Sequence, residues 1–346
     1  MSIAEITRGA TAIAPSRRLI YHLHKFGAHQ LAGKPRYYQS IVALSSRREY
    51  LHTYYRDCLL VLKKKWIMGK PVLYLLLPPV HKHRDLRIEG EVLAELRGLG
   101  IGAWLTDEDI DAYGIDRADA RLDSVEWLYR AGDWRKAALC GYKLRRDRNK
   151  INQAERIVHD DGIRVQAHGP GDPSFSVAAG MALAQAWGEQ KKDRVEAGKS
   201  DNARRSFHNE RVPNAFWNVQ ASSMGILTRA HVLTCLHHRQ AGFSYTESVA
   251  GGVVIILRLR NYDCTCMSTI GVYMHHLDLN FWSLAATPDT IVSYGGGTSE
   301  SGEAHKKSLH PIGHLDIYAV RGMRPITAEE WKASCQPLLG LSMVLK

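Results

Sequence analysis

A glycine-rich stretch near the end of the chain combines the residue types best suited to holding an anionic ligand. Four small residues follow a short β-branched run, in the order Gly295, Gly296, Gly297 and Thr298. This order predicts a strand, a tight turn and the start of a helix. Glycines let the backbone approach a ligand closely, and the free N–H groups at a helix start attract a phosphate or carboxylate. A tight turn without any ligand would need the same glycines, because such turns contain positive φ angles.

Two lysines, Lys306 and Lys307, follow within the predicted helix. Neighbouring helix residues point in different directions, so we expect one ammonium group to face the ligand and the other to face solvent. We favour Lys307 for the first position. Tyr294, directly before the glycines, is a further candidate for the catalytic site.

Candidate proton acceptors are a histidine pair and a glutamate. His275 and His276 stand just before Asp278, and Glu247 follows a predicted strand start. A neutral imidazole can take a proton from an amine, which makes His276 a candidate base alongside Glu247. A loop histidine pair and a buried or helix-capping glutamate would explain the same residues structurally. No third ligand stands at a recognisable spacing, so we expect no metal site.

The basic excess of the chain indicates an anionic partner. Its 46 lysines and arginines outnumber its 35 acidic residues, which gives a net charge of +11. An excess of this size is typical of proteins that bind polyanions. Basic and amide side chains cluster in one predicted helix within residues 141–156: Arg145, Arg146, Arg148, Asn149 and Asn152. We expect them to bind phosphates, with nucleic acid as the partner, although a solvated helix face would give the same pattern.

The composition indicates a folded protein with free thiols. Hydrophobic residues make up 45% of the 346 residues, enough for one large or two medium domains. The six cysteines form no Cys-x-x-Cys pair, which favours a reducing compartment. The longest apolar run, residues 71–80, is too short to span a membrane, and the chain does not open with a signal-peptide pattern. We therefore expect a cytoplasmic protein without a transmembrane segment, and its oligomeric state is open.

Alternating strand and helix patterns predict an α/β fold. The apolar run 72–77 ends at two prolines and predicts a buried strand. Apolar residues recur at helical spacing in 89–99, which predicts a helix that ends at Gly100. We expect Thr106 to form the N-terminal cap of the next helix. A loop at residues 168–173 suggests two lobes, residues 1–165 and residues 166–346.

Two of these motifs together resemble the GNAT-type domain at the C-terminus of lysyl-phosphatidylglycerol synthases and, more distantly, the Fem-type peptidyltransferases. Residues 141–152 are similar to the basic segment that joins the two halves of that domain. The glycine turn, the lysine pair and Pro311 are similar in order and spacing to the end of its second half. The resemblance spans residues 60–320. It departs from the family pattern at Tyr294, where an acidic residue is usual.

The resemblance implies two GNAT-like lobes, each a mixed, mostly antiparallel sheet flanked by helices. It also implies transfer of an acyl or aminoacyl group to an amine. The donor would be acetyl-CoA or another acyl-CoA, with aminoacyl-tRNA as the alternative. The glycine turn would hold this donor, and backbone N–H groups would polarise its carbonyl.

The basic surface suggests an anionic acceptor, such as an amine-bearing modified base in the DNA of a bacteriophage. Two alternatives stay open. One is lipid or peptide modification from aminoacyl-tRNA, and the other is nucleic-acid binding without catalysis.

Overall fold

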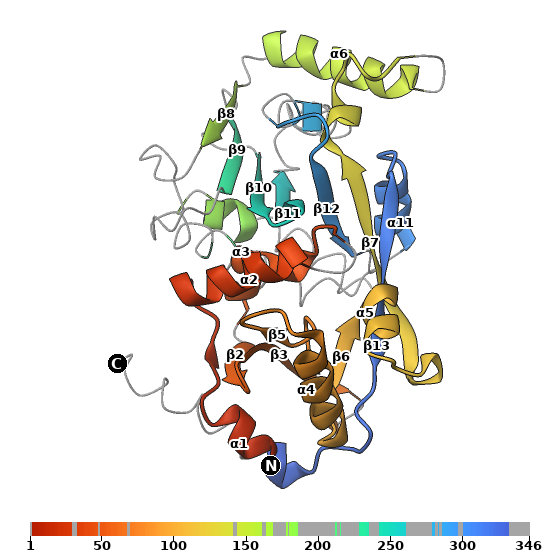
Figure 1. Ribbon diagram of the computed structural model, residues 1–346. Coiled ribbons are helices and arrows are strands. Elements are labelled where there is room, and N and C mark those ends of the chain that lie inside the picture. The colour runs from red at the N-terminus through yellow and green to blue at the C-terminus, as the bar shows by residue number, and fades with distance from the viewer. Residues whose placement is uncertain are drawn as a thin grey trace.

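The computed structural model describes residues 2–29, 33–47, 49–67, 70–140, 144–160, 164–168, 178, 180–185, 212, 215, 228–234, 242–260, 279–280, 283, 286–296 and 300–331. Within these residues the elements form two lobes, one above the other in Figure 1. The lower lobe holds most of the early strands, and the upper lobe holds β8 to β12.

The described strands join into one sheet of thirteen strands. In chain order they are β1 (Thr11–Ala12), β2 (Tyr50–Tyr55), β3 (Cys58–Ile67), β4 (Lys70–Leu75), β5 (Val80–His81), β6 (Gly102–Leu105), β7 (Ala120–Arg130), β8 (Arg164–His168), β9 (Thr228–Thr234), β10 (Gly242–Val249), β11 (Gly252–Arg260), β12 (Ile291–Gly296) and β13 (Gly313–Val320). Their order across the sheet is β1-β2-β3-β4-β6-β13-β7-β12-β11-β10-β9-β8, and β5 pairs with β3. Most neighbours are antiparallel, as predicted, and the parallel pairs are β4 with β6 and β11 with β12.

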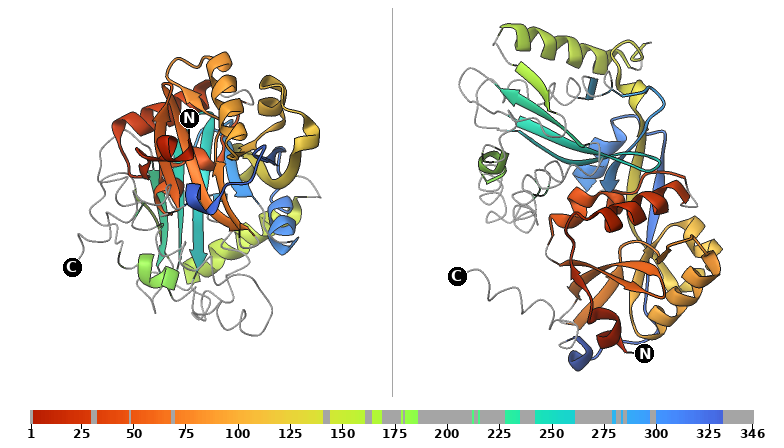
Figure 2. Two further views of the ribbon diagram at one scale, coloured as in Figure 1. Left: turned by 90° about the horizontal axis from the view of Figure 1, so that it is seen from below. Right: turned by 60° about the vertical axis from the view of Figure 1, so that its left-hand side comes forward.

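The helices lie on the sheet and between the lobes. They are α1 (Ile3–Thr7), α2 (Arg17–His29), α3 (Ile41–Ser45), α4 (Leu86–Gly98), α5 (Asp107–Ala112), α6 (Arg145–Asp160) and α11 (Glu300–Lys307), with short 3-10 turns η1 (Tyr37–Gln39), η2 (Arg117–Asp119) and η3 (Ala131–Trp134). Helices α2 and α3 lie at the level where the lobes meet, and α6 lies across the far end of the upper lobe (Figures 1 and 2). The mixed α/β fold class predicted from the sequence is confirmed.

Two long strands, β7 and β13, extend through both lobes and tie them together (Figure 1). Strand β13 lies between β6 and β7, so a strand from late in the chain fills the centre of the sheet. It pairs Tyr318 with Leu105 of β6, and Leu315 with Glu126 of β7. The domain boundary predicted after residue 165 falls within β8 and stays a prediction.

Local signals set several elements of the lower lobe. Asp85 accepts hydrogen bonds from the first N–H groups of α4, and Gly100 follows that helix with a φ of +93°. Thr106 caps α5 in a reciprocal pair with Asp109, as predicted. Strand β4 ends at Leu75 rather than at residue 77. The chain turns there because two prolines follow, yet the next two leucines stay buried.

One apolar cluster crosses the junction of the lobes. It joins side chains from α2, α3, β3, β10 and β13, among them Leu23, Leu44, Val61, Tyr245 and Ile317. A second cluster lies beneath α1 and α4 in the lower lobe. Because the first cluster draws on both lobes, burial of its apolar surface stabilises the lobes together rather than separately.

The topology predicts that residues 1–165 do not fold alone. Both neighbours of β7 in the sheet, β12 and β13, come from the later part of the chain. The isolated 1–165 fragment is therefore expected to lack a cooperative urea transition, because a strand without partners leaves its backbone groups unpaired. Co-expression with residues 166–346 should restore the transition. Cooperative unfolding of the isolated fragment would contradict this expectation.

Candidate functional site

The glycine turn predicted from the sequence lies on a β-bulge in β12. Ser293 pairs with Leu128 of β7 and Gly296 pairs with Glu126, so β12 carries one more residue than β7 between these pairs. Gly295, within the bulge, has a φ of +65°. Residues with a Cβ rarely adopt this conformation, which explains a glycine there. The predicted need for a positive φ angle is thus confirmed at Gly295.

The bulge stands where two parallel strands separate. Within the described residues, the parallel register of β11 and β12 consists of two pairs, Val253 with Val292 and Val254 with Ser293. The bulge begins directly after the second pair. Beyond this point the described part of β12 pairs with β7 at Gly296 but no longer with β11, so its edge toward β11 is not used by that ladder.

Lys306 holds the bulge from the side of α11. Its ammonium nitrogen lies 2.9 Å from the carbonyl oxygen of Tyr294 and 2.7 Å from that of Gly295. The residue is only 8% exposed, and its own carbonyl accepts a hydrogen bond from the hydroxyl of Tyr129 at 2.9 Å. The peptide bonds of the described residues are trans, so the N–H of Gly296 points opposite to the carbonyl of Gly295. Because that carbonyl points toward Lys306, the N–H of Gly296 points away from it.

Lys307 has the opposite environment. Its side chain is exposed, lies 3.9 Å from Glu303 and sits over the ring of Trp127. One lysine of the pair therefore faces the turn and the other faces solvent, as helical spacing requires. The structure places Lys306 against the turn, rather than the Lys307 that we favoured. A catalytic role for either lysine, or for Tyr294, stays a prediction.

A buried carboxylate connects the bulge to the N-terminal part of the chain. Glu126 accepts hydrogen bonds from the backbone N–H of Tyr37 at 2.9 Å and from the hydroxyl of Ser293 at 3.3 Å. The Ser293 oxygen in turn accepts the N–H of Gly295 at 3.2 Å. Burial raises the pKa of Glu126, an effect that these donors and the nearby Arg36 partly offset. Glu126 and Ser293 were not identified from the sequence as residues of the site. The one sequence signal for Glu126 was a single carboxylate between apolar residues of a strand.

Glu247, a candidate base, is engaged in capping a helix. Its carboxylate accepts hydrogen bonds from the hydroxyl of Ser40 at 2.6 Å and from the N–H groups of Ile41 and Val42 at 2.9 and 3.0 Å. Burial raises the pKa of Glu247 to about 7, although these donors lower it in part. The geometry gives Glu247 a structural role at the start of α3, and its role as a base stays a prediction.

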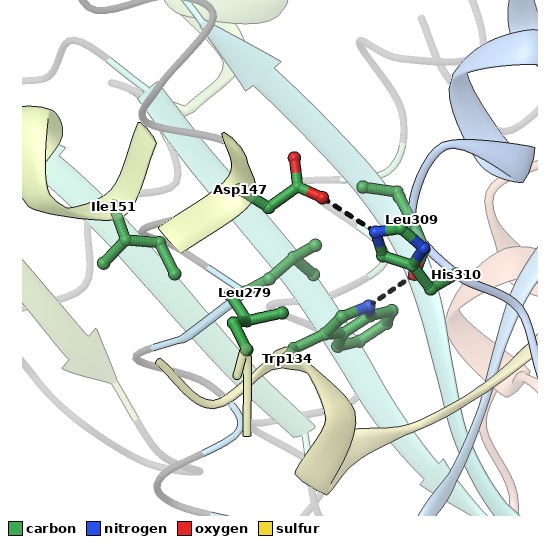
Figure 3. A pocket seen from close by; sticks show the side chains of 7 residues that line it. Trp134, Asp147, Ile151, Leu279, Leu309 and His310 are labelled. Carbon is green, nitrogen blue, oxygen red and sulfur yellow. Dashed lines mark hydrogen bonds and ion pairs between the residues drawn. The ribbon is translucent and has the colours of Figure 1, made fainter. Parts of the chain in front are cut away.

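The predicted basic helix is α6, and its inner face anchors it to the upper lobe. Asp147 lies 2.7 Å from His310 and also pairs with Lys150, while Ile151 is buried (Figure 3). Next to this contact the indole N–H of Trp134 donates to the carbonyl of Leu309 at 3.1 Å. The space between these side chains measures about 10 Å³, at the lower limit for a single water, so this contact is an anchor and not a ligand pocket.

The outer face of α6 presents cationic and amide side chains. Arg145, Arg146 and Asn149 are exposed, whereas Asn152 is half-buried. Arg148 is also half-buried and donates to the carbonyl of Leu139 at 3.3 Å. An open depression on this face is lined by Asn149, Asn152, Gln153, Arg156 and Ile157. Arg156 was not among the predicted phosphate ligands.

Some predicted site residues lie outside the described residues: Gly297, Thr298, His275, His276 and Asp278. Among the residues that the structure does describe, no group of three or more His, Cys, Asp or Glu side chains could hold a metal ion. None of the described helices is long and apolar enough to cross a membrane.

Comparison with known proteins identifies the fold. No family model matches the sequence, and no curated protein matches it significantly. Among solved structures, L-PGS from Bacillus licheniformis superposes with a TM-score of 0.55 at 12% identity, covering 92% of this chain and 96% of that one. The C-terminal domain of a putative lysylphosphatidylglycerol synthetase from Agrobacterium fabrum has a TM-score of 0.54 at 12% identity, with coverages of 95% and 98%.

The chain has the fold of the lysylphosphatidylglycerol synthetase C-terminal domain. The resemblance stated from the sequence motifs is confirmed at this level. A conserved protein of unknown function from Bacteroides thetaiotaomicron shares the same fold, with a TM-score of 0.58 at 13% identity and coverages of 89% and 97%. At such identities the likeness establishes the shared fold, not the substrates.

The two lysines should differ in their contribution to stability. Lys306→Met is expected to lower the free energy of unfolding by about 1–3 kcal/mol, because a buried carbonyl and a half-buried one lose a charged donor. Lys307→Met should change it by less than about 0.5 kcal/mol, as is usual for exposed positions. Urea denaturation of the two variants measures the difference. Equal effects would show that the ammonium group of Lys306 does not hold the bulge.

Proposed function

We propose that this chain is a GNAT-type N-acyltransferase that moves an acetyl, other acyl or aminoacyl group to an amine. The observation that supports this most directly is the β-bulge at Tyr294 and Gly295, located where β11 and β12 separate. The bulge turns the N–H of Gly296 away from Lys306. A fixed N–H group of this kind can polarise the carbonyl of an acyl donor.

In this proposal the protein acts mainly by positioning. The carbonyl oxygen of the bound acyl group accepts a hydrogen bond from the N–H of Gly296, while Lys306 keeps the bulge rigid from behind. The amine nitrogen attacks the carbonyl carbon, the new C–N bond forms and the bond to the donor breaks. The amine proton passes to water or to a base, for which His276 is the candidate, and the departing donor group takes up a proton.

The donor we propose is acetyl-CoA or another acyl-CoA, with aminoacyl-tRNA as the alternative. The acceptor we propose is anionic, and an amine-bearing modified base of bacteriophage DNA would fit it. The exposed arginines and amides of α6 support this choice. Arg145, Asn149 and Arg156 stand four and seven residues apart, so they lie on one face of the helix.

A thermal-shift titration tests the donor. Saturating acetyl-CoA or an aminoacyl-tRNA is expected to raise the melting temperature by several degrees, because a ligand that binds only the native state stabilises it. Gly296→Val should abolish the shift, since its side chain would project into the space beside the N–H group. Gly313→Val is the matched control, because a Cβ at Gly313 meets nothing within 4 Å.

The possible outcomes separate the alternatives. Loss of the shift in both variants would remove the assignment of the bulge as the donor site. A shift with DNA but with no acyl donor would favour a binding protein without catalysis.

The outer face of α6 should give salt-dependent binding to a short DNA duplex. Arg145→Glu combined with Arg156→Glu is expected to weaken binding and to flatten the plot of log K against log salt by about 2 units, because two phosphate contacts are lost. The control pair, Arg87→Glu with Arg121→Glu, changes the net charge by the same amount at exposed positions outside α6. It should weaken DNA binding and its salt dependence less. Equal effects of the two pairs would show that α6 is only a solvated face.

A further inference from the structure

A short segment of the N-terminal part, residues 35–42, crosses the junction of the lobes beside the bulge. We call it the crossing segment. Three buried carboxylates from three different elements hold it. Asp109 of α5 pairs with the guanidinium of Arg36 at 2.9 Å, Glu126 of β7 accepts the N–H of Tyr37, and Glu247 of β10 accepts the hydroxyl of Ser40. Each contact joins groups far apart in sequence, so the position of this segment is set by tertiary structure.

Tyr37 lies directly against Gly295. A Cβ placed on Gly295 would lie 3.0 Å from Cδ2 of Tyr37 and 3.5 Å from its Cε2. The ring therefore fills the space above the bulge that a side chain at this position would occupy. The ring also packs edge-on against Tyr38, at 5.5 Å between centroids, and Tyr38 stacks on Trp104. The backbone hydrogen bond to Glu126 and the ring of Tyr38 thus restrict movement of the Tyr37 side chain away from the bulge.

The ring of Tyr37 packs against the Cα of Gly295. The N–H of Gly296 belongs to the peptide group that follows this Cα. A group whose carbonyl binds this N–H consequently has the Tyr37 ring as a near neighbour. The Tyr37 hydroxyl forms no hydrogen bond with the described part of the chain, so the role inferred for this residue rests on its ring.

We propose that Tyr37 is the specificity-determining wall of the acyl site, and that it restricts the transferred group to a short one such as acetyl or alanyl. This inference rests on the proposed function. A longer acyl chain would have to displace a ring that Glu126 and the flanking contacts hold in place. Removal of the ring would open a cavity beside the bound carbonyl, into which a longer chain can extend.

A comparison of donors of different length tests whether Tyr37 limits the size of the transferred group. The wild type, Tyr37→Phe and Tyr37→Ala are compared by kcat/KM with acetyl-, butyryl- and hexanoyl-CoA, and with alanyl- and lysyl-tRNA, on an amine acceptor. The wild type and Tyr37→Phe are expected to prefer the short group by about tenfold to a hundredfold, as pockets that sense a few methylenes do. Tyr37→Ala should lose most of this preference by gaining activity on the long donor.

A stability measurement tests the same contact without any donor. Gly295→Ala should lower the melting temperature more in the wild-type background than in Tyr37→Ala, because the added methyl meets the Tyr37 ring only in the former. The strain of the positive φ angle is common to both backgrounds and cancels in the comparison. If Tyr37→Ala does not fold, Tyr37→Leu replaces it in both experiments, since leucine keeps part of the buried volume.

The results distinguish the wall from the function on which it rests. Transfer by the wild type with an unchanged donor preference in Tyr37→Ala overturns the role of Tyr37 and leaves the proposed function standing. Equal effects of Gly295→Ala in the two backgrounds overturn the contact itself. Failure of the wild type to bind or use any donor overturns both proposals.

Discussion

The arrangement of the candidate site depends on one carboxylate, Glu126, buried between the two lobes. It accepts the N–H of Tyr37 on one side and the hydroxyl of Ser293 on the other, and through Ser293 it reaches the N–H of Gly295. Burying a carboxylate is costly unless hydrogen-bond donors compensate for the lost water, so the donors from Tyr37 and Ser293 offset part of the cost of burying Glu126. The wall and the bulge are consequently parts of a single hydrogen-bonded unit.

The sheet explains how a residue of β7 can occupy that position. Strand β7 pairs with β12 on one side and with β13 on the other, so Glu126 stands opposite Gly296 of the bulged strand and opposite Leu315 of β13. The early part of the chain completes its lobe only when β13 returns to the centre. The lobes are therefore two regions of one sheet that share β7 and β13, and the site lies where the two regions meet.

The stretch from α11 to β13 links the bulge to the basic helix. Within five residues, Lys306 binds the carbonyls of the bulge, Leu309 accepts the indole N–H of Trp134, and His310 pairs with Asp147 of α6. His310 has a φ of +58°, an uncommon value for a residue with a side chain. Its contact with Asp147 helps to hold that backbone in place. The surface proposed for an anionic acceptor and the backbone proposed for the donor are thus joined by a short, well-anchored segment.

The sequence by itself determined the features that depend on neighbouring residues. The positive φ angle at Gly295, the cap formed by Thr106, helix α4 and the basic helix α6 all follow from local rules of backbone and side-chain chemistry. The division of the lysine pair was also predictable, but not which lysine faces inward, because that depends on where α11 packs. The roles of Glu126, Tyr37 and Glu247 were decided only by tertiary structure. Their partners are 89 and more than 200 residues away in the chain, and only the order of the strands brings such distant groups within hydrogen-bonding distance.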